Sequence, residues 1–264
     1  MKHAWERITQ LPPYSLTGKQ PAERLGAEFY FGEKATGFII EGGRVRGVRT
    51  DKGECGAEVV INAAGPWAAE VGKFAGVDVA VTPDQHEGAV TEAVSRFLEP
   101  LVVDIRPAKG SANYYFYQHA TGQVLFCITP SPNLWGYDVR ETSEFLPMVA
   151  QRMVDVIPRL KNLRIRRTWR GLYPMTPDAF PIIGWTKEVE GYLLAVGMCG
   201  QGFMLGPGVG EMLVRMVLKT QWLPFMRFIL LNIIQIIGFY EEALDFKWLL
   251  INKIKELFSG MKLA

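Results

Sequence analysis

The sequence predicts an α/β domain combined with an α+β domain of mostly antiparallel sheet, followed by a helical C-terminal tail. Three observations predict this fold. Short β-rich runs within residues 27–64 end at a helix start, β-rich runs recur across residues 79–170, and glycine-rich segments follow at 171–184 and 197–210. A chain that leaves one sheet, builds a second and returns to the first would produce this order. The expected segments are residues 1–78, 79–170, 171–220 and 221–264.

The first segment has the pattern of a β-meander. Three β-rich runs stand at residues 38–40, 45–49 and 59–61. Gly42-Gly43 and residues 51–53 separate them, as is typical of hairpins. The third run is continuously apolar, which favours a strand buried on both faces. It leads through residues 62–67 (NAAGPW) into a helical pattern, a place where open α/β sheets bind cofactors, although a tight turn alone would have the same sequence.

The second segment alternates β-rich runs with turn residues, which predicts a mostly antiparallel sheet. The runs are residues 89–92, 101–105, 114–117 and 124–129. One helix is expected before Pro158, because apolar residues recur at helical spacing from Phe145, and Thr142 or Ser143 can cap its start. The aromatic run 114–117 is expected to fill the core or an inter-domain face rather than to bind a ligand.

The two glycine-rich segments suggest a ligand pocket at the end of the first domain. They read GLYPMTPDAFPIIG at 171–184 and GMCGQGFMLGPGVG at 197–210, with a buried strand expected at 192–196 between them. The second segment runs into a helical pattern that begins at Glu211. A glycine-rich turn at a helix start presents free N–H groups and the positive end of the helix dipole to an anionic ligand atom.

Composition restricts the class of protein. The chain has 264 residues, of which 48% are hydrophobic and 21% charged, as in globular proteins. The net charge of +2 indicates no acidic partner, and the basic run 159–170 is expected to be a solvated loop and strand rather than a nucleic-acid site. Three cysteines lack metal spacing, so we expect no metal site and a reducing compartment. No signal peptide is expected at the start, which favours a cytoplasmic protein.

The C-terminal tail has an unusual composition. Residues 222–240 are mainly apolar but contain polar and helix-breaking interruptions, which argues against a membrane span. Residues 241–258 have the pattern of an amphipathic helix. We expect the tail to pack on the body of the protein or on a partner. Contact of 222–258 with a membrane surface is the less favoured alternative.

Three segments resemble the FAD-dependent amine and amino-acid oxidoreductases of the D-amino acid oxidase superfamily. They are VVINAAGPWA at 59–68, TWRGLYPMTPDAFPIIG at 168–184 and GMCGQGFMLGPGVGEML at 197–213, in the family's order. The sarcosine oxidase, glycine oxidase and proline dehydrogenase β-subunit types are the most similar. The resemblance covers approximately residues 20–220. It implies an incomplete FAD-binding, Rossmann-like domain and an antiparallel-sheet substrate domain.

The resemblance also implies roles for particular residues. The 64–67 turn would close over the FAD diphosphate and ribose, 171–178 would run along the isoalloxazine, and 200–204 would place N–H groups at its N1/C2=O edge. Such donors stabilise the negative charge of reduced flavin. Tyr173 matches a tyrosine near the substrate and is the candidate catalytic residue. The residues expected to bind FAD are Ala64, Gly65, Pro66, Trp67, Gly171, Pro174, Thr176, Asp178, Gly197, Gly200, Gln201, Gly202, Phe203 and Met204.

Several positions depart from the family pattern. Some relatives attach flavin to a cysteine where this chain has Gly171, so we expect non-covalent FAD. Sarcosine oxidases hold the substrate carboxylate with a lysine at the position of Met204, so that mode of binding is not expected. Cys199 is interpreted as a small packing residue, with a redox thiol as the alternative. His86 is interpreted as a hydrogen-bonded turn histidine, with a catalytic role as the alternative.

The largest departure concerns the N-terminal G-x-G-x-x-G unit that holds the ADP half of FAD in the family, which this sequence lacks. Met1 is then an internal start, or a separate chain supplies that unit. The favoured hypothesis is an FAD-dependent oxidoreductase, as a fragment or subunit, that removes hydride from a carbon next to the neutral nitrogen of a small amine or amino acid. The alternatives are a non-catalytic, partner-binding module without flavin and a membrane-surface protein.

Overall fold

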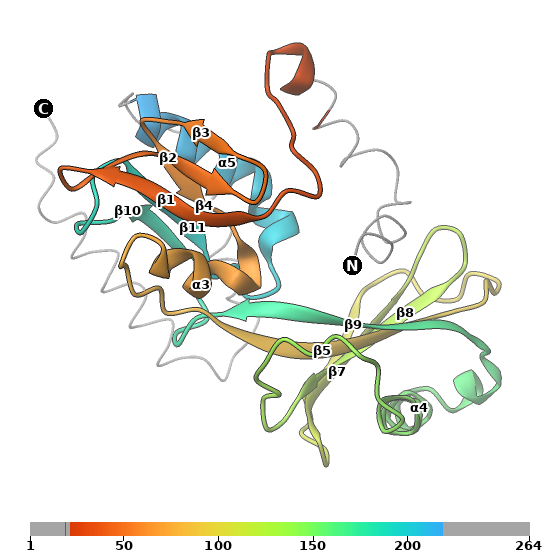
Figure 1. The fold of residues 1–264 in the computed structure, drawn as a ribbon. Coiled ribbons are helices and arrows are strands. Elements are labelled where there is room, and N and C mark those ends of the chain that lie inside the picture. Colours follow the sequence, from red (N-terminus) through yellow and green to blue (C-terminus); the bar gives the residue numbers. More distant parts are fainter. Residues whose placement is uncertain (1–18, 20–21, 219–264) are drawn as a thin grey trace, which may run out of the picture. The chain divides into compact units, whose positions relative to one another are not determined.

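The computed structural model of the protein describes residue 19 and residues 22–218 (Figure 1). The chain divides into two compact units, Met1–Phe203 and Met204–Ala264, and all the described strands belong to the first. The expectations for the tail, including membrane-surface contact by 222–258, lie outside the described residues. In the described part of the chain, none of the helices combines the length and apolar character needed to cross a membrane.

The first sheet is the predicted meander. Strands β1 (Ala35–Glu41), β2 (Arg44–Thr50) and β3 (Glu54–Gly56) pair antiparallel in that order. Gly42 and Gly43 join β1 to β2 with φ angles of 57° and 78°. Positive φ at both central residues is what a tight hairpin of this type requires, and glycine adopts it without steric cost.

The second sheet joins two distant parts of the chain. Its order is β10 (Ile182–Trp185), β11 (Tyr192–Val196) and β4 (Val60–Asn62), with β4 parallel to the fully buried β11. The prediction that the β4 run is buried on both faces is wrong, because Ile61 is 40% exposed. Val60 and Asn62 are buried on one face, and Ile61 between them points to the other. Among the described residues β4 pairs only with β11, so its other edge is unpaired.

The predicted strand-to-helix turn follows β4. A short 3-10 helix, η1 (Gly65–Trp67), runs directly into helix α3 (Ala68–Lys73). Helix α3 packs closely on the chain that follows it, since a Cβ at Gly72 would lie 2.6 Å from the Val79 side chain. These elements share one core with both sheets, through Phe38, Val45, Val60, Ala68, Val79, Tyr192 and Val196.

The third sheet is antiparallel throughout, as predicted for this part of the chain. Its order is β6 (Val102–Asp104), β7 (Ser111–Gln118), β8 (Val124–Pro130), β5 (Thr82–Thr91) and β9 (Ile165–Met175). Strand β9 pairs with β5 along almost its whole length (Figure 1). It therefore carries the chain across the boundary expected at 170/171, and GLYPM (171–175) is the end of this strand.

One helix covers one face of the third sheet. Helix α4 (Phe145–Val156) ends before the 3-10 helix η2 (Pro158–Asn162), as predicted, and packs Val149 and Met153 on Tyr114 and Phe116. The predicted cap by Thr142 or Ser143 is wrong: no side chain caps the helix, whose N-cap residue is Glu144. The Thr142 hydroxyl instead donates to Glu87 Oε1 at 2.6 Å.

The last described element is helix α5 (Gly202–Leu218). The sequence predicted its helical pattern only from Glu211, because glycine and proline at 206–210 disfavour a helix interior. The helix nevertheless begins at Gly202 and contains Pro207. The glycine-rich turn therefore ends nearer to Gly200 than the sequence indicated.

Candidate active site

The face of the third sheet opposite α4 forms the wall of a pocket. Residues paired across an antiparallel ladder share a face, and alternate residues along a strand occupy opposite faces. Strand register places His86 opposite Gly171 and Tyr115 opposite Cys127 on this face. The pocket has a volume of about 770 Å³, within the range of small-molecule and cofactor sites. Its sheet wall includes His86, Gly88, Tyr115, Tyr117, Leu125, Cys127, Trp169, Gly171 and Tyr173.

The aromatic run 114–117 is divided between two environments. Tyr114 and Phe116 are fully buried in the core with α4, as the sequence predicted. Tyr115 and Tyr117 point to the other face and line the pocket. The alternation of a strand explains the division, because neighbouring side chains cannot both face the helix.

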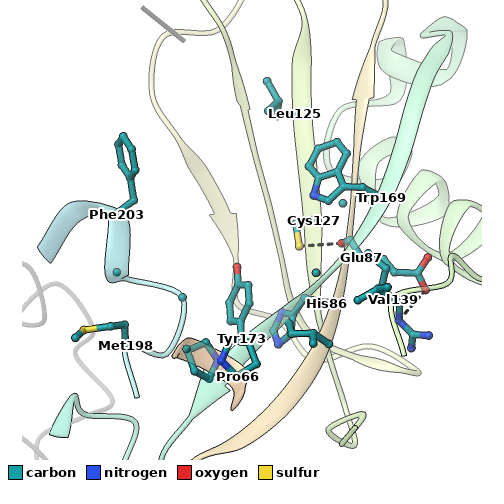
Figure 2. Close-up of a pocket in the computed structure, with 18 of the residues that line it drawn as sticks. Pro66, His86, Glu87, Leu125, Cys127, Val139, Trp169, Tyr173, Met198 and Phe203 are labelled. Carbon is teal, nitrogen blue, oxygen red and sulfur yellow. Dashed lines mark hydrogen bonds and ion pairs between the residues drawn. The ribbon is translucent and has the colours of Figure 1, made fainter. Parts of the chain in front are cut away.

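The other pocket wall comes from the predicted cofactor segments. The η1 turn contributes Gly65, Pro66 and Trp67, and the glycine-rich segment contributes Gly200, Gly202 and Phe203. Figure 2 shows Met198 and Phe203 on this side, with Tyr173, Trp169 and Leu125 along the strands. Among the predicted site residues, those that line the pocket are Gly65, Pro66, Trp67, Gly171, Tyr173, Pro174, Gly200, Gly202 and Phe203.

Other predicted residues support the pocket from behind. Thr176 Oγ1 donates to the Phe180 carbonyl at 2.8 Å and lies 3.2 Å from Asp178 Oδ1. A Cβ at Gly197, where φ is 70°, would lie 2.3 Å from Thr176 Cγ2. These contacts join the two glycine-rich segments, so Thr176, Asp178 and Gly197 hold the pocket wall together rather than line it.

Three further predicted residues occupy different positions. Ala64 donates its N–H to Asn62, and Gln201 donates its N–H to the Met198 carbonyl. Met204 belongs to the second unit.

Cys199 is a packing residue within the glycine-rich segment. Its N–H donates to the Pro174 carbonyl at 3.2 Å, and its Sγ lies 3.1 Å from the Gly197 carbonyl. Its φ of 48° is unusual for a residue with a side chain. The structure therefore favours the packing interpretation over a redox thiol.

A buried asparagine that the sequence analysis did not single out shapes the η1 turn. Asn62 Nδ2 donates to the Ala68 carbonyl at 3.0 Å and to the Tyr192 hydroxyl at 2.9 Å. Its Oδ1 accepts from the Ala64 N–H at 3.1 Å. One side chain therefore fixes both ends of the turn to the second sheet.

Tyr173 is held by contacts on several sides. Its hydroxyl lies 3.0 Å from the Tyr115 hydroxyl, and its ring stacks on His86 with a centroid separation of 3.9 Å and an interplanar angle of 5°. The backbone of Gly200 also lies against it, since a Cβ there would be 2.4 Å from Tyr173 Cε2. Burial raises the pKa of Tyr173, so its phenol is neutral and can donate a hydrogen bond.

His86 lies inside strand β5, so the interpretation as a turn histidine is wrong. Its side chain is only 5% exposed, and Nε2 lies 3.0 Å from Asp84 Oδ2. Asp84 also accepts from Asn133 Nδ2 at 2.7 Å and from the Leu134 N–H at 2.8 Å. Burial lowers the pKa of His86, and the hydrogen bond and charge of Asp84 oppose this shift.

This burial predicts a pH dependence of stability. The folded pKa of His86 is lowered, so the unfolded chain binds a proton first as pH falls, and stability is lost below the unfolded value of about 6.5. The titratable groups around it are Asp84, Tyr173, Tyr115 and Cys127. We expect His86→Gln to lose less stability than the wild type between about pH 7.5 and pH 5 in urea unfolding. His119→Gln, at a half-buried histidine outside the pocket lining, is the control, and an equal loss in wild type and His86→Gln would contradict the prediction.

A buried ion pair joins β5 and β9, and both of its residues contribute to the pocket lining. Glu87 and Arg170 are register partners, with Oε1 and Nε 3.8 Å apart and each side chain 7% exposed. Glu87 also accepts from the Thr142 N–H at 3.0 Å. This pair therefore fixes the segment before α4, and its charges are already matched.

The pocket suits a flat apolar ring with an electron-rich edge. A Cβ at Gly171 would meet no atom within 4 Å, so space is open beside this strand. Aromatic and aliphatic side chains form most of the sheet wall. Helix α5 begins at Gly202 on the facing wall, and the N–H groups of a first turn have no partner within the helix.

Comparison with known proteins shows the family of the chain. The sequence profile of the family described as FAD dependent oxidoreductase (DAO) matches residues 18–216. Hydrogen cyanide synthase subunit HcnC of Pseudomonas aeruginosa is 34% identical over 212 residues, which is 79% of this chain and 49% of that protein. Glycine oxidase of Pseudomonas putida is 30% identical over 172 residues, 65% of this chain and 45% of that protein.

Solved structures show the same fold. L-proline dehydrogenase from P. horikoshii superimposes with a TM-score of 0.70 at 34% identity, covering 77% of this chain and 54% of that one. The fold is therefore that of an FAD-dependent oxidoreductase. The chain belongs to the DAO family of FAD-dependent oxidoreductases. It spans about half the length of the curated relatives it matches.

Proposed function

We propose that the protein is part of an FAD-dependent oxidoreductase that oxidises the C–N bond of a small amine or amino acid. The observation that supports this most is the meeting of three distant segments, 65–67, 171–174 and 200–203, around one pocket. Its relatives include a glycine oxidase and an L-proline dehydrogenase, whose names specify amino acids. A general oxidoreductase assignment follows from the family, and the substrate class is our inference.

Residues of this chain would hold the flavin half of FAD. The η1 turn would contact the ribose and diphosphate side, and the end of β9 would lie along the ring. The N–H groups of Gly200, Gly202 and Phe203 would face the ring edge where negative charge develops on reduction, whereas the Gln201 N–H is donated to the Met198 carbonyl. Bound FAD supplies the hydride acceptor. Gly171 offers no side chain for a covalent link, so FAD would be non-covalent at this position.

The sheet wall would bind and orient the substrate. The Tyr173 hydroxyl can donate a hydrogen bond into the pocket, and Tyr115 restrains it at 3.0 Å. Tyr117, Leu125 and Trp169 would cover the apolar part of the substrate and exclude water. A substrate held in this way must present its amine as the neutral base, because hydride leaves the adjacent carbon only when the nitrogen lone pair is free.

The ADP half of FAD requires a phosphate-binding unit that these residues do not provide. We infer that polypeptide beyond this sequence supplies the G-x-G-x-x-G loop, either in a longer form of the chain or in a separate chain. The relative from Pseudomonas aeruginosa is named as a subunit. Strand β4 pairs only with β11 among the described residues, so its other edge is available to such a unit.

The test is co-purification with a polypeptide that carries the G-x-G-x-x-G unit. We expect the assembly to show the visible absorption of oxidised flavin, and acid precipitation to release all of it into the supernatant. Anaerobic addition of an N-methylated or cyclic amino acid is expected to bleach that absorption. Absorption that stays with the precipitated protein would contradict the non-covalent assignment. An assembly that contains no flavin would favour the partner-binding module.

A further inference from the structure

A buried pair of polar residues beside the pocket has no role in the proposed chemistry. Asp84 is fully buried in strand β5, and the side chain of His86, two residues later on the same face, is 5% exposed. His86 lines the pocket, whereas Asp84 lies behind it. Buried ionisable side chains are retained only where partners compensate for their desolvation.

Asp84 is a fixed anchor. Its carboxylate accepts hydrogen bonds from Asn133 Nδ2 at 2.7 Å and from the Leu134 N–H at 2.8 Å. The Gln85 N–H donates back to the Leu134 carbonyl at 2.9 Å, so this part of the chain is bound to β5 by backbone as well as side chain. The carboxylate therefore has little freedom to turn.

Asp84 in turn fixes the plane of the His86 ring. The contact between Nε2 and Oδ2 is 3.0 Å, and a carboxylate acceptor holds the proton on Nε2. Nδ1 is buried and has no hydrogen-bond partner among the described residues. The imidazole thus has a single polar attachment, and this attachment sets the direction in which its flat face points.

That flat face lies on Tyr173. The rings are 3.9 Å apart and within 5° of parallel. Figure 2 shows the two side chains next to each other at the pocket. Tyr173 also contacts the Tyr115 hydroxyl at 3.0 Å and lies against the backbone of Gly200. If the imidazole were absent, the tyrosine ring would lose the contact that covers one of its faces and could rotate.

We propose that the Asp84–His86 pair is a positioning device, in which His86 stacks on Tyr173 and fixes the direction in which the Tyr173 hydroxyl is presented to the substrate. His86 acts through Tyr173 and does not itself react. This inference rests on the proposed function, in which the Tyr173 hydroxyl binds substrate. Asp84 and His86 lie outside the segments expected to bind FAD. Their effect is therefore on the orientation of the substrate and not on the binding of the cofactor.

A double-mutant cycle in the flavin-containing assembly tests the route through Tyr173. We expect His86→Ala to raise KM about tenfold, the order found for coupled neighbours, with a smaller change in kcat. In a Tyr173→Phe background, where there is no hydroxyl to orient, His86→Ala is expected to leave KM unchanged. His86→Phe, which keeps a flat ring, is expected to recover most of the lost affinity. His119→Ala, at a half-buried histidine outside the pocket lining, is the matched control.

The kinetic results distinguish positioning from packing. A purely structural role would make the effects of His86→Ala and Tyr173→Phe additive, and that outcome would overturn the proposal. A His86→Phe variant with a KM as high as that of His86→Ala would also overturn it.

Nuclear magnetic resonance of the histidine rings tests the geometry without flavin or turnover. The chain has three histidines, so the His86 signals can be assigned with a His86→Gln variant. We expect the Nε2–H tautomer at neutral pH and ring protons shifted upfield by Tyr173, with the shift lost in Tyr173→Leu. The Nδ1–H tautomer, or a shift that persists in Tyr173→Leu, would overturn the positioning device. Failure of the proposed function alone would leave these signals unchanged, so the two failures are distinguishable.

Discussion

Replacing Gly200 with valine is expected to abolish flavin retention by the assembly while leaving the protein folded. Gly200 has a φ of 83°, and a Cβ there would lie 2.4 Å from Cε2 of Tyr173. A β-branched residue is strained at positive φ, and it would also force the tyrosine ring or the 200–203 turn to move. Either movement displaces the N–H groups that start helix α5. The conformational strain alone costs on the order of 1–3 kcal/mol, which a domain of this size can absorb.

The measurement is flavin absorbance per protein after gel filtration, together with the urea midpoint of unfolding. Gly37→Ala is the matched control, because Gly37 lies in β1 with no atom within 4 Å of its Cβ position and without a positive φ. Gly202→Ala should be milder than Gly200→Val, since Gly202 has no positive φ and its Cβ would lie 3.2 Å from Met198 Cβ, a smaller overlap than at Gly200. Normal flavin content in Gly200→Val would show that the glycine-rich turn is not part of the cofactor site.

The sequence indicated the local parts of the site because each part has a local cause. Apolar β4 followed by small residues predicts the η1 turn, and positive φ explains why glycine stands at Gly197 and Gly200. These signals lie within a few residues of the feature they produce. The three segments they mark do line one pocket or support it directly, as the resemblance implied.

What the sequence could not predict depends on long-range register. In the sequence, nothing near His86 indicates its partner Tyr173. The pairing of β5 with β9 brings the two side chains together. Thr142 is a good helix cap by residue type, because its hydroxyl oxygen can accept from a helix N–H. In the fold this hydroxyl instead donates to the buried carboxylate of Glu87 on strand β5. Residue type predicts which hydrogen bonds a side chain can form, and only the fold determines which partner is available.

Arg152 is a buried cation beside the third sheet, and its removal is expected to be strongly destabilising. Arg152 of α4 is 6% exposed and donates from Nη1 to Ser111 Oγ at 2.5 Å. Its Nη2 donates to Asp104 Oδ2 at 3.2 Å and to the Arg106 carbonyl at 2.5 Å. Arg152→Leu would remove this donor from Ser111 Oγ and from the Arg106 carbonyl, while Asp104 would keep its hydrogen bonds from Arg106. We expect a loss of about 3–5 kcal/mol in the free energy of unfolding, measured by urea titration.

Arg106→Ala is the control. It removes an exposed arginine that also binds Asp104, so it shows how much stability depends on charge near Asp104 and not on burial. Hydrogen bonds from Arg106 are the largest cause that lowers the pKa of Asp104, with a smaller contribution from Arg152. Arg106 is 73% exposed, however, so water can replace its contacts, and its loss should cost only about 0–1 kcal/mol. Equal destabilisation by the two variants would show that charge near Asp104 matters more than the buried contacts of Arg152.

The loss of Arg152 is also expected to affect the pocket, because strand β7 places side chains on both faces of the sheet. Arg152 binds Ser111 at the start of β7, and this strand packs Tyr114 and Phe116 under α4. The residue between them, Tyr115, faces the pocket and bonds Tyr173. A shift of β7 toward α4 would therefore move the Tyr115 hydroxyl away from Tyr173. Arg152→Lys keeps the charge but loses the forked contact. We expect this variant to remain folded and to have a raised KM.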